Sequence, residues 1–303
     1  MAFLGLRLGN EPEMGPADIQ SLGILAEEHG YGEVWMTEGA GRDSLTQLTA
    51  IAAVTSRIGL GTGILPMFSR TPLITAMSSA GLAAVSDGRF ILGLGVGNRP
   101  ATEDGHGVAF SQPMEHLSDL IHIVRGLLQG EEVSHDGKAI TVSKASLGHA
   151  APTGKVPIYI AALGPRMLRL AGAIADGVLL SWTATSYLEQ AIQLVRDGAV
   201  KAGRDPSEVE ISGYLRVAMT GDLDAGRASL KKRSPATPAD RTTGLISVIP
   251  GSMPRWLGRK RPGAIPTTRP WPRPLVRTCS RNWAWSVRPR SAGHASRNCG
   301  VWA

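Results

Sequence analysis

The segment Leu163-Gly164-Pro165-Arg166 has the residue types of an anion-binding helix start. Proline is favoured at the first position of a helix, where the backbone amides lack intrahelical partners. Those amides and the helix dipole attract an anion, and a guanidinium beside them adds a charged donor. The segment is therefore a candidate phosphate site. The alternative is an ordinary helix start with an exposed Arg166.

Glu38 follows a short apolar run, residues 33–36, and is a candidate catalytic group. A carboxylate at a strand end can act as a general acid or base, or it can orient a substrate. The alternative interpretation is an ion pair with Arg42. Asp43 directly precedes a segment of helical period, so it is expected to cap a helix instead.

Two glycine-rich runs, residues 59–63 and 93–97, offer backbone that a ligand can approach closely. Neither is a dinucleotide fingerprint, because the G-x-G-x-x-G spacing is missing and Asn98 stands where the third glycine would fall. Steric packing at strand ends is the alternative. The sequence has no H-x-H, no H-E-x-x-H and no carboxylate pair at ligand spacing, so no metal is expected. It also lacks the G-x-S-x-G turn of a hydrolase.

Short apolar runs alternate with segments of helical period from the N-terminus to about residue 230. Strict alternation of strand and helix predicts a parallel sheet covered by helices. Seven such steps of about 30 residues fit a (β/α)₈ TIM barrel that lacks its last strand and helix, with an open doubly wound sheet as the alternative. The expected strands are 3–8, 33–36, 58–64, 90–96, 156–162, 177–182 and 209–219; the expected helices are 16–29, 44–55, 72–84, 113–128, 165–175 and 186–202; a hairpin is expected at 131–142.

A barrel builds its active site at the carboxyl ends of its strands. The candidate residues fall at such ends, because Glu38 follows the second expected strand and Arg166 follows the fifth. Glycine and polar residues gather at the other ends as well. These ends are residues 61–66, 95–100, 162–166 and 181–183.

Composition divides the chain near residue 230. Residues 1–230 carry 17 Lys and Arg against 24 Asp and Glu, a net charge of −7, whereas residues 231–303 carry 15 against one, a net charge of +14. The second segment also holds half of the prolines, five of the seven tryptophans and both cysteines. We expect a barrel domain over 1–230 and a disordered Pro/Arg/Trp-rich tail over 231–303. Translation out of frame explains such a tail, and a nucleic-acid-binding tail is the alternative.

The remaining composition excludes several classes of protein. Residues 1–230 contain no cysteine, which excludes a disulfide framework and a thiolate metal site. The N-terminus has no basic region leading into a long apolar stretch, as a signal peptide would have. No apolar run approaches the roughly 18 residues that a membrane span needs. A cytoplasmic protein without a membrane segment is expected.

Three further runs carry a family resemblance: residues 26–35 (AEEHGYGEVW), 57–64 (RIGLGTGI) and 86–97 (SDGRFILGLGVG). With them, residues 3 to about 230 resemble the bacterial luciferase-like family of flavin- or deazaflavin-dependent oxidoreductases. Residues 163–168 (LGPRML) and 175–180 (ADGVLL) resemble the branch that uses coenzyme F-420.

The resemblance implies a TIM barrel with the flavin-type ring at its carboxyl mouth. A cis peptide between Gly63 and Ile64 would press on one face of the ring, and Asn98 would bond its edge. The LGPR segment would bind the cofactor phosphate. Ser181 and Trp182 would line the wall of the site opposite that peptide. The implied cofactor-binding residues are Thr62, Gly63, Ile64, Asn98, Leu163, Gly164, Pro165, Arg166, Ser181 and Trp182.

The implied activity is hydride transfer between a deazaflavin (F-420) and a small organic substrate. An FMN-dependent monooxygenase is the alternative, followed by an inactive truncated product or a nucleic-acid-binding tail protein. Many family members carry His one residue after the acid of the second strand, where this chain has Gly39, so Glu38 is the remaining catalytic candidate there. The intact fold is compatible with a homodimer, and a nucleic-acid partner is not expected.

Overall fold

The computed structural model describes residues 4–9, 14–39, 41–148, 154–181, 183, 185–214, 216–220, 222, 224, 225, 228 and 246–250. All of them fall within one unit, Met1–Ser252. Within the basic segment 231–303 only residues 246–250 are described, so the expectation of a disordered tail concerns residues outside the described part.

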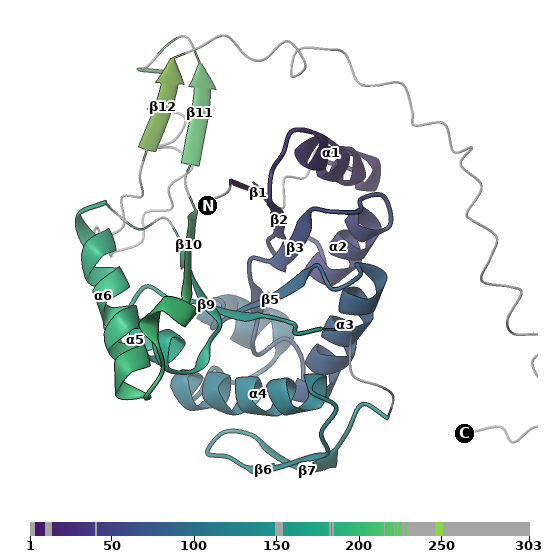
Figure 1. Cartoon of the computed structure of the whole chain (residues 1–303), viewed down its shortest axis with the longest axis vertical. Helices are drawn as coiled ribbons and strands as arrows, with labels where there is room; N and C mark the ends of the chain where they lie inside the picture. Colours follow the sequence, from purple (N-terminus) through teal and green to yellow (C-terminus); the bar gives the residue numbers. More distant parts are fainter. Residues whose placement is uncertain are drawn as a thin grey trace, which may run out of the picture. The chain divides into compact units, whose positions relative to one another are not determined.

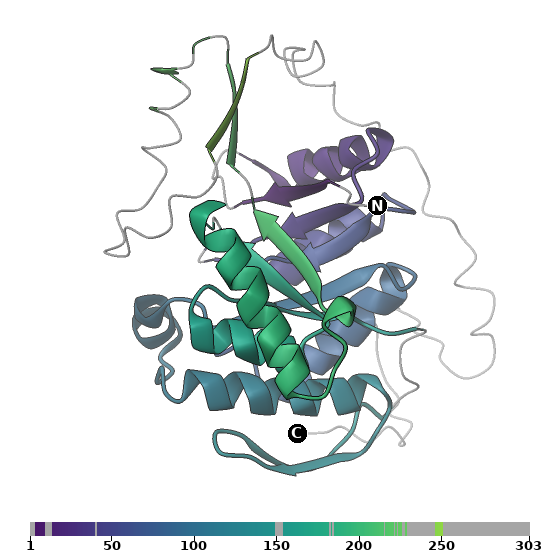
Figure 2. The ribbon, with the colours of Figure 1, turned by 60° about the vertical axis from the view of Figure 1, so that its left-hand side comes forward.

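Among the described residues, eight strands form one sheet, and every pairing between them is parallel (Figures 1 and 2). The strands follow one another in chain order, which is the order of a barrel and excludes a doubly wound sheet. The predicted barrel is thus confirmed. The barrel is nearly but not fully closed. Within the described ranges its strands pair in order from β1 to β10, but no pairing joins β1 to β10. The strands are β1 (Gly5–Leu8), β2 (Glu33–Met36), β3 (Gly59–Thr62), β4 (Leu65–Pro66), β5 (Phe90–Gly95), β8 (Ile158–Ala161), β9 (Gly177–Ser181) and β10 (Glu210–Tyr214).

Helices alternate with these strands along the chain and lie outside them (Figure 2). Proline stands in the first turn of α1, α3, α4 and α5, where a missing amide leaves no hydrogen bond unmade. As predicted, Asp43 caps α2, since its carboxylate accepts a hydrogen bond from the Thr46 amide at 2.6 Å. The helices are α1 (Pro16–Glu28), α2 (Ser44–Ala52), α3 (Pro72–Val85), α4 (Pro113–Leu128), α5 (Pro165–Ile174) and α6 (Thr185–Lys201), with a π-helical turn at Ala101–Gly105 and a 3-10 turn at Pro206–Glu208.

The seventh expected strand, 209–219, is wrong in its extent. It divides into β10, which belongs to the barrel, and β11 (Arg216–Thr220), which pairs in parallel with β12 (Ile246–Pro250) in a separate two-stranded sheet. The apolar pattern runs on through both parts, so it marks no break. The barrel portion of this strand therefore ends at Tyr214, five residues earlier than its pattern suggests.

The inserted hairpin is present as β6 (Val133–Asp136) and β7 (Thr141–Ala145). Asp119 of α4 fastens it, accepting hydrogen bonds from the Ala139 and Ile140 amides at 2.8 and 3.1 Å and pairing with the His135 ring at 2.9 Å. These bonds lower the pKa of Asp119, although burial acts to raise it. The hairpin is thus docked on α4 through one carboxylate.

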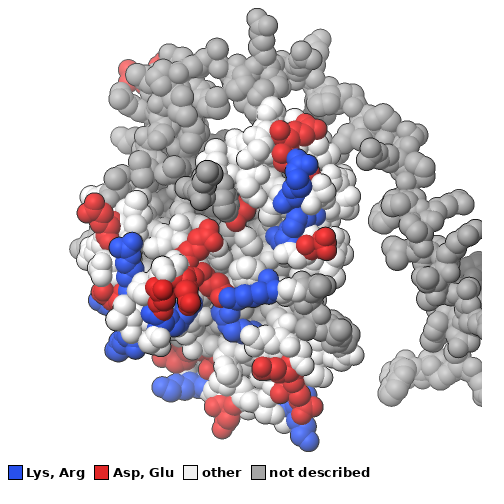
Figure 3. Space-filling model, in the orientation of Figure 1, with Lys and Arg blue, Asp and Glu red and all other residues white. Residues whose placement is uncertain are grey.

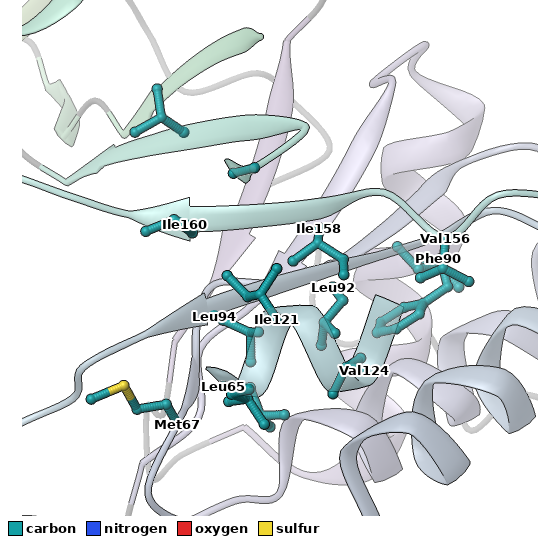
Figure 4. Close-up of a cluster of buried hydrophobic side chains, with 14 of the residues drawn as sticks. Leu65, Met67, Phe90, Leu92, Leu94, Ile121, Val124, Val156, Ile158 and Ile160 are labelled. Atoms are coloured by element: carbon teal, nitrogen blue, oxygen red, sulfur yellow. The ribbon is translucent and has the colours of Figure 1, made fainter. Parts of the chain in front are cut away.

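Aliphatic side chains fill the layer between the strands and α4. Leu92 and Leu94 of β5 and Ile158 of β8 are fully buried and meet Ile121 and Val124 of α4 (Figure 4). Burial of each such side chain stabilises the fold by about 1.5–3 kcal/mol. This layer fixes the positions of β5 and β8, whose carboxyl ends carry candidate site residues.

Glycine at two of the strand positions is required by packing. A Cβ atom added to Gly93 would lie 1.9 Å from the Thr62 carbonyl oxygen, and one added to Gly61 would lie 2.3 Å from the Trp35 ring. Both distances are far inside van der Waals contact. The steric interpretation of the glycine-rich runs is therefore correct at these positions.

Glu27, in the first of the resemblance motifs, joins the end of α1 to the start of β3. Its carboxylate accepts hydrogen bonds from the Arg57, Ile58 and Ser56 amides at 2.6, 2.8 and 3.1 Å. Burial acts to raise the pKa of Glu27, but these backbone bonds outweigh it and hold the pKa below its usual range. The motif therefore carries a structural cross-link.

Candidate functional site

Three of the predicted residues, Thr62, Gly63 and Ile64, lie in sequence at the carboxyl end of β3. The peptide between Gly63 and Ile64, directly after β3, is cis, as the resemblance implied. Thr62 is fully buried, and its hydroxyl donates to the Gly93 carbonyl and accepts from the Gly93 amide, both at 2.8 Å. Its side chain thus holds β3 against β5 and fixes where the following residues lie.

Glu38 lies in a buried ion-pair network. Its carboxylate accepts from Arg70 Nη1 at 2.5 Å and from the Ser44 hydroxyl and amide at 2.9 and 3.2 Å. Arg70 also pairs with Asp43. The side chains of Glu38 and Arg70 are only 10% and 16% exposed, so the pair is largely desolvated. The carboxylate is therefore fixed in orientation by three donor groups, with Arg70 as the ion-pair partner.

Asn98 lies exposed in the loop after β5 and starts a helical turn. Its side-chain oxygen accepts from the Ala101 amide at 3.3 Å, and its backbone oxygen accepts from the Thr102 amide at 2.9 Å. The neighbouring Arg99 guanidinium lies 4.6 Å from the centre of the Phe110 ring. The loop is therefore held by its own side chains, with Asn98 at the barrel mouth.

The predicted phosphate site is the start of α5. Gly164 is the N-cap in an extended conformation, and among the described residues no side chain caps the helix and no atom lies within 4 Å of where a Cβ atom on Gly164 would be. Leu163 and Arg166 are exposed, and the Leu163 carbonyl accepts from the Tyr187 hydroxyl at 3.1 Å. An open, uncapped helix start beside a guanidinium has the donor set that a phosphate requires.

The opposite wall is only partly visible. Ser181 ends β9, is half-buried, and stands opposite Tyr214 in the pairing of β9 with β10. Trp182 lies outside the described residues. Thr183 is buried, and its hydroxyl has no hydrogen-bond partner among the described residues.

Tyr214 is a further residue at the barrel mouth that the sequence pattern did not single out. It ends β10, its hydroxyl is buried without a partner in the described part of the chain, and a Cβ atom on Gly63 would lie 1.9 Å from that hydroxyl oxygen. The sequence signal for Tyr214 is a tyrosine within a strand of apolar pattern. The pattern predicts that this strand ends at residue 219, so Tyr214 does not stand out as a strand-end residue. The Tyr214 and Thr183 hydroxyls, which lack partners among the described residues, suit the polar edge of a ring ligand, and the open start of α5 suits a phosphate.

The amino-terminal layer of the barrel interior differs, because its polar groups are paired. Glu33 accepts from Trp35 Nε1 at 2.7 Å, and Glu210 accepts from the Tyr159 hydroxyl at 2.5 Å. Burial raises the pKa of Glu33, and the charge of Glu210 raises it further, against the hydrogen bond from Trp35. The polar groups at the amino-terminal end of the barrel interior are therefore hydrogen-bonded to one another, unlike the Tyr214 and Thr183 hydroxyls at the carboxyl end.

A cavity of about 300 Å³ lies elsewhere, between α4 and the docked hairpin. It is lined by His122, His135 and Arg125 among others, and the two imidazole rings are 4.7 Å apart. Arg125 is already committed to Asp176, at 3.0 Å. Within the described ranges, no group of three His, Cys, Asp or Glu side chains has an arrangement that would hold a metal ion.

The charged surface and the helices add two observations. In the face shown in Figure 3, the described acidic and basic side chains are interspersed. None of the helices in the described part of the chain has the length and hydropathy required to cross a bilayer.

Known proteins resemble this chain over most of its length. A 5,10-methylenetetrahydromethanopterin reductase of Methanolobus tindarius is 42% identical over 205 residues, which cover 67% of this chain and 61% of that protein. An F420-dependent glucose-6-phosphate dehydrogenase of Nakamurella multipartita is 34% identical over 231 residues, covering 71% of this chain and 67% of that protein. The chain thus spans about three fifths of the length of the Methanolobus relative.

A solved structure supports the same relationship. The coenzyme F420-dependent tetrahydromethanopterin reductase of Methanopyrus kandleri superposes with a TM-score of 0.67 at 31% identity, covering 73% of this chain and 68% of that one. The family model described as "Luciferase-like monooxygenase" matches residues 3–242. This chain belongs to the luciferase-like monooxygenase family.

Proposed function

We propose that this protein is an oxidoreductase that transfers a hydride between a deazaflavin of the coenzyme F420 type and a small organic substrate. The observation that carries the proposal is the open start of α5, with Gly164 uncapped and Arg166 exposed beside it at the barrel mouth. Similarity at 31% and 34% identity to two proteins named for F420 dependence favours the deazaflavin over FMN.

A reduced deazaflavin supplies a hydride from its central ring carbon when it is bound. The chain's own residues would do the rest. The amides that follow Gly164 and the Arg166 guanidinium would bind the phosphate, and Gly63 with Ile64 would lie against one face of the ring. The remaining proposed contacts are Thr62, Asn98, Leu163, Pro165, Ser181 and Trp182.

Glu38 is proposed as the carboxylate that handles a proton or orients the substrate. Its support is its place at the end of β2, where the mouth of the barrel begins. The Arg70 and Ser44 donors fix its position, as a catalytic carboxylate requires. The same bonds would suit a purely structural ion pair, so a loss of turnover with retained folding in Glu38→Gln distinguishes the two roles.

The substrate is proposed only by class. The Methanopyrus kandleri reductase and the Nakamurella multipartita dehydrogenase are both named for F420 but for unlike substrates, a pterin derivative and a sugar phosphate, so the element that their names share is the cofactor and not the substrate. An FMN-dependent monooxygenase is the second candidate, and the family's description supports it.

Arg166→Ala is expected to weaken binding of the phosphorylated cofactor by about 1–3 kcal/mol, because a charge-assisted hydrogen bond is lost. Titration of the 303-residue chain with F420, followed by deazaflavin fluorescence, measures this change. Arg169→Ala, an exposed arginine one turn further along α5, is the matched control and should bind like the wild type. Equal affinity of the wild type and Arg166→Ala would remove the phosphate assignment.

A homodimer is proposed through the outer face of α3. Leu73, Ile74, Met77 and Val85 are 38–54% exposed on this helix, which contains no charged residue. An uncharged apolar face is complementary to a second copy of itself across a two-fold axis. Sedimentation of the purified chain as a monomer at all concentrations would contradict the dimer.

Residues 231–303 are proposed to be out-of-frame text following a barrel domain over 1–230. The abrupt change in charge and proline content supports this, as does a family match that ends at residue 242. Sequencing the coding DNA around codon 231 decides it, since stop codons throughout the other frames would exclude a shift. An inactive truncated product is the further alternative to the proposed oxidoreductase, and absence of F420 binding by the 303-residue chain would favour it. The nucleic-acid alternative predicts that residues 231–303 bind nucleic acid with an affinity that falls as salt rises.

A cytoplasmic location is also proposed, and cell fractionation tests it.

A further inference from the structure

The Tyr214 hydroxyl is buried and has no hydrogen-bond partner in the described part of the chain. It lies at the carboxyl end of β10, and no described residue offers it a hydrogen bond. The hydroxyl lies close to the backbone of Gly63, because a Cβ atom added to Gly63 would fall 1.9 Å from the hydroxyl oxygen. The hydroxyl therefore sits against the segment that follows β3, at the barrel mouth.

The carboxylates of the interior do not satisfy Tyr214. Glu33 is bonded to Trp35, and Glu210 is bonded to Tyr159, both in the layer below. Arg7 of β1 lies near the Tyr214 ring, with its guanidinium carbon 5.8 Å from the ring centre, and is a donor rather than an acceptor. Buried polar groups in native proteins are nearly always hydrogen-bonded, so an orphan at a site mouth indicates a ligand atom.

The chemistry of the phenol limits what that ligand atom is. Burial raises the pKa of Tyr214, the Arg7 charge lowers it, and the Glu33 charge raises it again, with a net increase. The hydroxyl therefore stays protonated at neutral pH and has a proton to donate. The complement of that proton is an acceptor, such as a carbonyl oxygen or an unprotonated ring nitrogen.

A second orphan lies on the adjacent strand. Thr183 is 7% exposed, follows the end of β9, and has a buried hydroxyl without a partner in the described residues. Because β9 and β10 are paired in parallel with Ser181 opposite Tyr214, the two hydroxyls come from neighbouring strand ends. Two such donors on one side suit the heteroatom-rich edge of a flat ring.

We propose that Tyr214 is a cofactor-binding residue whose hydroxyl donates a hydrogen bond to a ring-edge acceptor of the bound deazaflavin. Thr183 is the neighbouring polar contact on the same edge. This inference rests on the proposed function, because it names a further residue of the same site. It adds the end of the seventh strand to the walls of the cofactor site.

The test is a Tyr214→Phe variant of the full chain, titrated with F420 by fluorescence and followed by absorbance. The expected result is a 5- to 10-fold rise in Kd and a displaced absorption band of the bound deazaflavin, because the phenol no longer bonds the ring, with the melting temperature of the ligand-free protein unchanged or raised. Unchanged affinity and spectrum would overturn the inference.

Tyr159→Phe is the matched control, because it removes a phenol that is already bonded to Glu210. It should lower the melting temperature and leave the Kd for F420 unchanged. An equal loss of affinity in both variants would overturn the inference, since it would reflect general destabilisation. If the wild type itself binds no F420, the proposed function is wrong. If the wild type binds F420 and Tyr214→Phe binds it equally well, only the proposed role of Tyr214 is wrong.

Discussion

Arg89→Met is expected to destabilise the barrel by about 3–5 kcal/mol, because hydrogen bonds from a charged donor to buried acceptors contribute about 1.5–3 kcal/mol each and are not fully additive. Arg89 follows α3 and reaches back across two elements. Its guanidinium donates to the Ser86 and Ile58 carbonyls at 2.7 Å, and to the Thr55 carbonyl and hydroxyl at 3.1 and 3.2 Å. Methionine preserves the apolar stem and removes every donor.

Urea denaturation of the wild type and Arg89→Met measures this difference. Arg57→Met removes an exposed arginine nearby in the fold and should change the free energy of unfolding by less than about 0.5 kcal/mol. Arg89→Lys should recover only part of the loss, because an ammonium cannot reproduce the planar fork of donors. A loss below about 1 kcal/mol in Arg89→Met would contradict the assigned cross-link.

Gly172→Ala is expected to destabilise the protein by about 3 kcal/mol, because the added methyl group overpacks the crossing of two helices. A Cβ atom on Gly172 of α5 would lie 1.9 Å from the Val195 carbonyl oxygen of α6. Gly198 makes the reciprocal approach, 2.1 Å from the Arg169 carbonyl oxygen. Backbone atoms cannot move aside as a flexible side chain does, so the helices themselves must separate.

Gly81→Ala is the matched control, since Gly81 also lies within a helix but its Cβ would meet no atom of the described residues within 4 Å. This variant should be more stable than the wild type by about 0.5–1 kcal/mol, the difference in helix propensity between alanine and glycine. Thermal and urea melts of both variants therefore shift in opposite directions. A shift of the same sign in the two would exclude the packing explanation.

Most of the fold could be predicted from residue patterns because each helix and strand has a local signal. Proline and apolar spacing predicted a helix over 113–128, and α4 has those bounds. The same signals failed over 209–219, where apolar residues recur at alternate positions on both sides of Tyr214 although the chain leaves the barrel sheet after that residue. Tertiary pairing decides where a strand changes its partner. An alternating apolar pattern shows which face of a strand is buried, but it does not show which strand pairs with it.

The candidate site divides in the same way. The phosphate segment follows from residue types within four positions, so its helix start could be predicted and lies where expected. The partner of Glu38 could not, because Arg70 is 32 residues away and meets it only when β2 and the loop before α3 are assembled. Tyr214 needed still more, since its significance depends on Gly63 standing against its hydroxyl.

The motifs of the family resemblance are largely structural in this chain. Glu27 and Arg89 cross-link neighbouring elements through backbone atoms, and Asp176 accepts from the Ile158 amide at 2.9 Å. Asp176 also pairs with Arg125 and with Lys155, at 3.0 and 2.6 Å. Burial acts to raise the pKa of Asp176, yet these partners lower it overall. These residues stabilise the fold, whereas the residues proposed for binding and catalysis lie at the strand ends.

We expect the barrel mouth to bind a deazaflavin in preference to FMN. Equilibrium titration of the purified 303-residue chain with oxidised F420 and, separately, with FMN tests it most directly. The predicted result is saturable binding of F420 with one site per chain, and weaker binding of FMN under the same conditions. Tighter binding of FMN, or no saturable binding of F420, would contradict the account.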